Sequence, residues 1–268
     1  MGLLLDTVTV RSAPLAERFA LAAAAGYAGL ELWGDELDEH PEGVAGIRAL
    51  SERYRMPVIG ICPHRSLYDW HHRWDAGLEA TFETEIARYA ETGADYLVLP
   101  VLSEAGSLAA TEANLRRVAD ICRHFAMTAA LEPIGHVRKL ARIADALAIL
   151  QRVPEAGLVV DIFHFFRGRN RLQDLQGLDP GRIAVVHLDD AVDLPLDQLF
   201  GFKHRVYPGR GIFDVVGLCA ALRRIGYAGR YAVELLNPDY WQADPEVVSR
   251  TAWQTSTAVL DAAENQRQ

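Results

Sequence analysis

The segment Gly157-Leu158-Val159-Val160-Asp161-Ile162-Phe163-His164 guides the interpretation of the whole chain. Its aliphatic and β-branched residues form a short apolar run, which is typical of a strand buried on both faces. Asp161 and His164 lie three residues apart where that strand is expected to end. A buried carboxylate must be hydrogen-bonded, paired or bound to a metal, because burial of a bare charge is costly.

Three more apolar runs end in the same way. Residues 127–131 lead into Glu132, residues 183–186 lead into His187, and residues 230–233 lead into Glu234. All four terminal residues are of types that ligate metals. Their recurrence at four strand ends predicts a shared site better than any one of them alone, since a single such residue is usually an ordinary hydrogen-bonded group.

Strand and helix patterns alternate along the whole chain. A barrel of eight βα units fits about 250 residues and places active-site groups at the C-terminal strand ends. A doubly wound open sheet is the rival, but the Gly-x-Gly-x-x-Gly turn expected there is absent from the sequence. We therefore expect one (β/α)8 TIM barrel domain over residues 1–268. The predicted strands are 3–10, 28–33, 57–62, 96–101, 127–131, 158–162, 183–188 and 231–235, and the predicted helices are 14–26, 44–54, 78–90, 108–125, 140–150, 172–178, 215–225 and 245–263.

Composition narrows the possible partners and locations. The 36 acidic and 27 basic residues give a net charge of −9, which argues against a nucleic-acid partner. The three scattered cysteines suit a reducing compartment. No secretion signal and no apolar stretch of membrane-spanning length is evident, so we expect a cytoplasmic protein without a membrane partner. A homo-oligomer, dimeric or tetrameric, stays possible.

Strand alternation supports a metal site. Each candidate ligand shares a strand face with the residue two positions before it, and in a barrel that face can point inward. Glu132, Asp161, His187 and Glu234 would then meet at one rim. Three carboxylates and one imidazole suit one divalent ion, for which we favour Mn²⁺ over Mg²⁺, Co²⁺ or Zn²⁺.

Other residues are candidates for binding substrate, each with a simpler structural alternative. His164 begins the loop after its strand, although it could simply stack on its phenylalanine neighbours. His64 and Glu31 are close to the ends of strands three and two and could reach substrate. Arg205 or Arg210, in a glycine-rich turn, could bind a substrate oxygen. Asp189 follows His187 by two residues and could orient a ligand as an outer partner.

The motifs together resemble the xylose-isomerase-like barrel superfamily of sugar isomerases and epimerases, and within it the inosose (2-keto-myo-inositol) isomerases. The resemblance covers essentially the whole chain. It is carried by the segments 131–136, 157–165, 187–190, 193–195, 205–209 and 233–240. It implies that Glu132, Asp161, His187 and Glu234 hold the metal, that Glu132 and Glu234 transfer protons, and that His164 and Arg205 contact substrate oxygens.

The expected activity is therefore the isomerisation or epimerisation of an unphosphorylated cyclitol ketone or keto-sugar, in inositol or carbohydrate metabolism. A metal-stabilised enediolate would form and paired glutamates would move its proton. The closest alternative is a dehydratase of inosose or 3-dehydroshikimate type, with His164 or His136 as the acid. A three-zinc DNA-repair endonuclease would need more histidines and a basic face. A non-catalytic barrel subunit is the remaining alternative.

Overall fold

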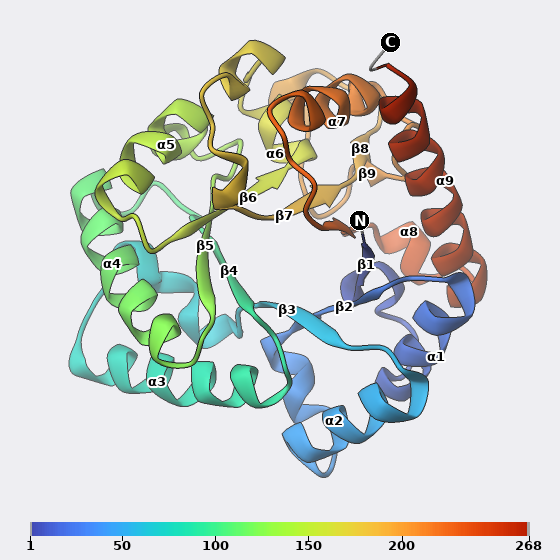
Figure 1. Ribbon diagram of the computed structural model, residues 1–268, viewed down its shortest axis with the longest axis horizontal. Coiled ribbons are helices and arrows are strands. Elements are labelled where there is room, and N and C mark those ends of the chain that lie inside the picture. The colour runs from blue at the N-terminus through green and yellow to red at the C-terminus, as the bar shows by residue number, and fades with distance from the viewer. Residues whose placement is uncertain (1, 267–268) are drawn as a thin grey trace.

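The computed structural model describes residues 2–266, and its centre is a closed barrel of eight parallel strands (Figure 1). The strands follow the order β1-β10-β7-β6-β5-β4-β3-β2 around the barrel. The predicted (β/α)8 fold is confirmed. The barrel strands are β1 (Leu3–Asp6), β2 (Gly29–Trp33), β3 (Val58–Cys62), β4 (Tyr96–Pro100), β5 (Thr128–Glu132), β6 (Gly157–Asp161), β7 (Ile183–Leu188) and β10 (Tyr231–Val233).

Helices surround the barrel and cover the outer faces of its strands (Figure 1). The α-helices are α1 (Leu15–Ala25), α2 (Gly43–Tyr54), α3 (Ala76–Glu91), α4 (Leu108–His124), α5 (Ile143–Arg152), α6 (Ile162–Arg167), α7 (Val215–Arg224), α8 (Pro238–Trp241) and α9 (Pro245–Asn265). Short 3₁₀ helices span Thr7–Val10, Gly34–Asp38, Arg65–His71, Arg138–Leu140, Leu172–Leu175, Pro180–Arg182 and Leu196–Gln198. No helix between residues 2 and 266 is both long and apolar enough to cross a membrane.

The inward faces of the strands form a separate small core. Ala130, Val159, Val185 and Ala232 belong to it, and each precedes a predicted metal ligand by two positions. Because side chains alternate along a strand, the four predicted ligands point into the same space. The predicted inward face is therefore confirmed.

Gly60 makes room for an aromatic side chain inside the barrel. A Cβ atom at residue 60 would lie 2.1 Å from the ring of Tyr96. Tyr96 is 1 % exposed and belongs to the same inner core. A strand glycine here allows a close approach that no other residue permits.

Three of the predicted elements differ from the structure. Strand β1 ends at Asp6, whose side chain accepts the N–H of Val8 and begins a 3₁₀ helix. Strand β6 ends at Asp161, and the next residues form helix α6, so His164 lies in a helix and not in a loop. The helix predicted over residues 172–178 is reduced to one 3₁₀ turn, Leu172–Leu175.

A two-stranded ribbon lies above β7. Strand β8 (Asp190–Ala191) pairs antiparallel with β9 (Arg205–Val206), and Ala191 is the partner of Arg205. The pairing places Arg205 at the rim of the barrel, after the loop of residues 192–204.

Candidate metal centre and substrate pocket

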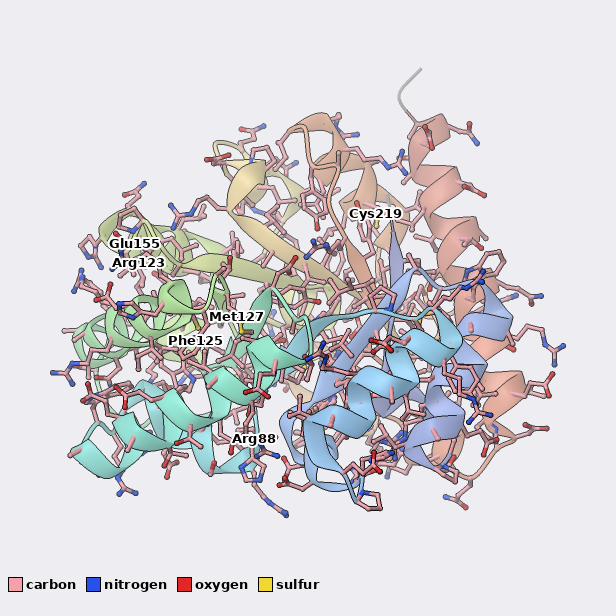
Figure 2. All side chains as sticks on the ribbon, turned by 60° about the horizontal axis from the view of Figure 1, so that its bottom comes forward. Arg88, Arg123, Phe125, Met127, Glu155 and Cys219 are labelled. Atoms are coloured by element: carbon pink, nitrogen blue, oxygen red, sulfur yellow. The ribbon has the colours of Figure 1, made fainter. Side chains whose placement is uncertain are left out.

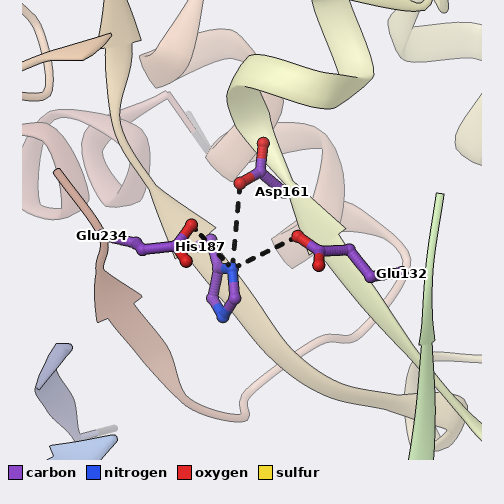
Figure 3. Close-up of side chains that lie close together, drawn as sticks. All are labelled: Glu132, Asp161, His187 and Glu234. Carbon is purple, nitrogen blue, oxygen red and sulfur yellow. Dashed lines mark ion pairs between the residues drawn. The ribbon is translucent and has the colours of Figure 1, made fainter. Parts of the chain in front are cut away.

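The four predicted ligands converge at the C-terminal rim of the barrel (Figure 3). Each of Glu132, Asp161, His187 and Glu234 offers one ligand atom, and these atoms all lie within 4.8 Å of one another. All four residues are buried. Glu132 and Asp161 end β5 and β6, His187 lies in β7, and Glu234 directly follows β10.

The imidazole of His187 points one nitrogen at the three carboxylates. Its Nδ1 lies 3.4 Å from Glu234 Oε2, 3.7 Å from Glu132 Oε1 and 3.8 Å from Asp161 Oδ2. This nitrogen is buried and, like Nε2 of the same ring, forms no hydrogen bond of regular geometry within residues 2–266. A buried polar atom without a partner is costly, whereas a cation between these groups would satisfy it. The donor set of one nitrogen and three carboxylate oxygens suits a divalent metal.

The electrostatics of the cluster favour positive charge. Burial lowers the pKa of His187, but the carboxylates of Glu31 and Glu234 raise it well above its ordinary value. Burial raises the pKa of Glu132 to about 7, and the neighbouring charges of Glu234 and Asp161 add to that effect. Carboxylates held this close together attract a proton or a metal ion.

Glu31 holds the other nitrogen of the same ring. His187 Nε2 lies 2.9 Å from Glu31 Oε1, and the Tyr96 hydroxyl donates a hydrogen bond to Glu31. Glu31 is fully buried and is not among the residues that line the pocket. The strand end thus places this carboxylate against His187, and a substrate contact of Glu31 stays a prediction.

Arg205 binds three carboxylates through a single nitrogen. Its Nη1 lies 2.6 Å from Asp189 Oδ2, 2.6 Å from Glu234 Oε2 and 2.8 Å from Asp161 Oδ2. Burial alone would raise the pKa of Asp161, but Arg205 and His164 hold it well below its ordinary value. Asp189 also accepts the Phe163 N–H at 2.9 Å. Asp189 thus orients Arg205, and within the described part of the chain no hydrogen bond or ion pair joins it to a predicted ligand.

Two histidines join this polar group. Arg205 Nη2 lies 3.3 Å from His164 Nε2, and the rings of His164 and His136 are 6.4 Å apart. Burial lowers the pKa of His164 to about 4, so the ring is neutral near pH 7. The guanidinium can only donate, so a neutral His164 carries its proton on Nδ1.

A cavity of about 220 Å³ opens over the cluster. Five polar side chains line one part of it, and the rest of the lining is apolar or aromatic. The polar residues are Glu132, His136, His164, Arg205 and Glu234, and the others include Trp33, Cys62, Pro63, Tyr68, Val98, Pro100, Leu102, Ile134, Phe200, Phe202 and Leu236. Predicted residues His136, His164 and Arg205 are therefore brought to the cavity.

His64 and Arg210 are not brought there. The ring of His64 contacts Ser66 at 2.7 Å and Asp35 at 3.2 Å, and neither His64 nor Arg210 lines the cavity. Tyr68, four residues further along the same loop, lines it instead. Sequence reasoning also missed Trp33, Phe200 and Phe202, although an aromatic residue at the end of β2 and two phenylalanines in a loop after β7 were available signals.

Comparison with known proteins agrees with the geometry. Residues 19–260 match the family model described as xylose isomerase-like TIM barrel. An inosose isomerase of Halalkalibacterium halodurans is 32 % identical over 149 residues, an alignment that spans about half the length of that relative (54 % of this chain, 52 % of the relative). An inosose isomerase of Bacillus velezensis is 26 % identical over 270 residues (95 % of each chain).

The solved structures agree in fold. The IolI protein with a bound zinc atom superposes with a TM-score of 0.88 at 23 % identity, over 97 % of this chain and 98 % of that one. Curated relatives as a group comprise isomerases, epimerases and a dehydratase. The extent of the family match, together with the closed eight-stranded barrel, establishes that this chain belongs to the xylose isomerase-like TIM barrel family.

Proposed function

We propose that this protein is a divalent-metal-dependent isomerase or epimerase of a cyclitol ketone or keto-sugar. One observation carries the proposal. Glu132 and Glu234 belong both to the buried cluster of metal-ligand types and to the lining of the cavity. Carboxylates in that double position can touch a ketone held at the cluster.

The positions of the two glutamates suit proton transfer. Glu132 and Glu234 come from β5 and β10, the outer two of four consecutive barrel strands. A bound divalent metal would polarise the ketone and acidify the adjacent C–H bond. One glutamate would remove that proton, and return to the neighbouring carbon would be isomerisation. Return to the same carbon from the opposite face, by the other glutamate, would be epimerisation.

Arg205 and the histidines would hold the substrate in place. The Nη2 of Arg205 and the neutral ring of His164 lie together at the cavity wall. We propose that they contact substrate oxygens, while Asp189 keeps the guanidinium in position through the 2.6 Å contact. His136 lines the same wall and has no hydrogen-bond partner among the described residues, so it can serve a further oxygen.

The choice among metals is also a proposal. We favour Mn²⁺ because carboxylate oxygens dominate the donor set, and Zn²⁺, Mg²⁺ and Co²⁺ are the alternatives to test. Calorimetric titrations of the metal-free protein with each of the four ions would rank their affinities.

Deuterium exchange tests the reaction. Metal-loaded protein with 2-keto-myo-inositol in D₂O should show exchange beside the ketone in proton NMR, together with a new inosose, and chelation should abolish both. A new alkene signal would instead assign the dehydratase alternative. Absence of exchange with cyclitol ketones and keto-sugars alike would contradict the proposal.

Variants of the glutamates test the proton transfer. Glu132→Gln and Glu234→Gln should each lower kcat by about 10²–10⁴-fold, which is the usual size of a general acid–base contribution. Glu52→Gln, at an exposed position of α2, is the matched control and should retain full activity. Near-normal turnover by either active-site variant would show that its glutamate moves no proton.

A further inference from the structure

A second, outer cavity of about 520 Å³ adjoins the cavity over the metal cluster. The two cavities share four lining residues, which we call the apolar wall: Trp33, Tyr68, Phe202 and Leu236. These residues come from four separate parts of the chain: the end of β2, the 3₁₀ helix after β3, the loop between β8 and β9, and the loop after β10. A ligand that occupies both cavities would contact this wall.

The polar groups of the inner cavity gather away from the wall. Glu132, His136, His164, Arg205 and Glu234 line the inner cavity, and none of the five belongs to the described lining of the outer one. A fully hydroxylated ring presents hydroxyl groups all around, and each one buried without a partner weakens binding. The wall therefore matches a part of the ligand that carries no hydroxyl groups.

Two phenylalanines at the cavity are exposed without a ligand. Phe200 and Phe202, on either side of Gly201, are 67 % and 63 % exposed. An aromatic side chain that lines a pocket but is exposed to water gains binding free energy when an apolar group covers it. Phe202 lines both cavities, so a group that covered it would lie at their junction.

Two of the remaining wall residues, Trp33 and Leu236, are held in place. The Trp33 indole Nε1 donates to Asp6 Oδ1 at 2.9 Å, which holds the ring in place. Leu236 is 5 % exposed and well packed. A rigid aromatic face binds a flat apolar group at little entropic cost.

The outer cavity offers no surplus of positive charge for a phosphate. Its Arg18 pairs with Glu36 at 2.6 Å and with Glu39 at 3.3 Å. Its Arg65 pairs with Asp35 at 2.9 Å. Arg11 also lines this cavity and lies over the ring of Trp241. The three arginines of the lining are matched in number by the acids Asp35, Glu36 and Glu39, so the wall and the outer cavity together favour an uncharged group.

We propose that the substrate is a keto-sugar that carries an aryl or alkyl substituent through a glycosidic oxygen, and that the apolar wall binds this substituent. The inference rests on the proposed function, since the sugar ring would occupy the metal end of the inner cavity. The substituent would extend between Trp33 and Phe202 toward the outer cavity. This substituent would cover Phe202 and would need no hydrogen-bond donor from the apolar wall.

A pair of ligands tests the inference without catalysis. Calorimetry on metal-loaded protein would compare phenyl and methyl glucopyranoside, which share the sugar and differ in the substituent. We expect phenyl glucopyranoside to bind about ten-fold more tightly or better, as burial of an aromatic ring predicts. The 3-keto forms of the same glycosides should show the same preference in kcat/KM.

Variants locate the contact. Phe202→Ala should reduce the phenyl-over-methyl preference by raising KM for the phenyl glycoside, because the wall contacts a part of the substrate remote from the reacting carbons. Phe125→Ala is the matched control, since this half-exposed phenylalanine follows α4 and lines neither cavity (Figure 2). It should leave the preference unchanged.

The outcomes separate the two proposals. Equal binding and equal turnover of the two glycosides would overturn the inference while the proposed reaction stands. An equal loss for both glycosides in Phe202→Ala would also overturn it, because the residue would then support the site as a whole. Absence of metal-dependent exchange with every ketone would overturn both proposals.

Discussion

His187 is held from both sides of its ring, and this arrangement decides which nitrogen is free for a metal. Glu31 lies 2.9 Å from Nε2, and the three carboxylates surround Nδ1. A carboxylate on the far nitrogen fixes the tautomer and makes the near nitrogen a better ligand. We therefore propose that Glu31 would act through His187 on a metal bound at the cluster.

The variant Glu31→Gln should weaken metal binding by about 10-fold or more, in line with the usual effect of removing such an outer carboxylate. The signal of free Mn²⁺ in electron paramagnetic resonance measures the affinity directly. Tyr96→Phe, which removes only the hydrogen bond to Glu31, should have a smaller effect. Unchanged affinity in Glu31→Gln, with an unfolding curve like that of the parent protein, would show that His187 needs no such support.

The sequence predicted the four cluster residues because each ends an apolar run and so has a fixed place in a barrel. The structure places His64 and Glu31 outside the described lining of the cavity, for two different reasons. His64 lies in a loop, where its ring finds Asp35 and Ser66 as partners. Glu31 lies on the correct strand face, but its partner His187 is far away in sequence and could not be identified by spacing.

Among the elements, α6 shows where pattern reasoning fails. Its sequence Ile-Phe-His-Phe-Phe-Arg has apolar residues at almost every position, so it continues the preceding strand without a change of period. The boundary is set by Asp161, which accepts the His164 N–H at 2.6 Å and caps the helix. One carboxylate thus ends a strand, starts a helix and belongs to the cluster of four candidate ligands.

Strand β3 provides a test of packing inside the barrel. Gly60→Ala should destabilise the fold by about 1–3 kcal/mol, the usual cost of excess volume in a packed core. The added methyl group would meet the Tyr96 ring at 2.1 Å. Denaturant unfolding measures the change in the free energy of unfolding.

Gly77→Ala is a suitable control for this prediction. Gly77 lies in the first turn of α3, and the nearest atom to an added Cβ is Asp75 Oδ1 at 3.2 Å. Alanine favours helix, so this variant should be neutral or slightly stabilising. A loss of stability as large as that of Gly60→Ala would contradict the role given to Tyr96.

For the whole molecule, the strand order explains why four residues spread over a hundred positions form one cluster. Strands β5, β6, β7 and β10 are consecutive neighbours around the barrel, and Asp161 is the register partner of His187. Regular βα alternation was sufficient to predict this. It could not predict the loops that shape the apolar wall, since long loops lack a period. A single domain over residues 1–268, the oligomeric state and a cytoplasmic location stay predictions.

Metal loading should stabilise the whole barrel, because the four ligands meet only in the folded chain. At a free metal concentration of 100 times Kd the gain is about 2.7 kcal/mol. Thermal unfolding with and without Mn²⁺ measures it as a rise in Tm. Asp161→Asn should show a smaller rise, with its own metal-free form as reference. A Tm that is independent of the metal would contradict binding at this cluster.

The closure of the barrel has a consequence for folding during synthesis on the ribosome. Strand β10 pairs with β1 on one side and β7 on the other, and Glu234 follows it directly. Strand β1, which is synthesised first, therefore lacks one neighbour until β10 has been synthesised, and only then can the barrel close. Until then the growing chain lacks Glu234, so a nascent chain cannot assemble the cluster of four residues before Glu234 has emerged.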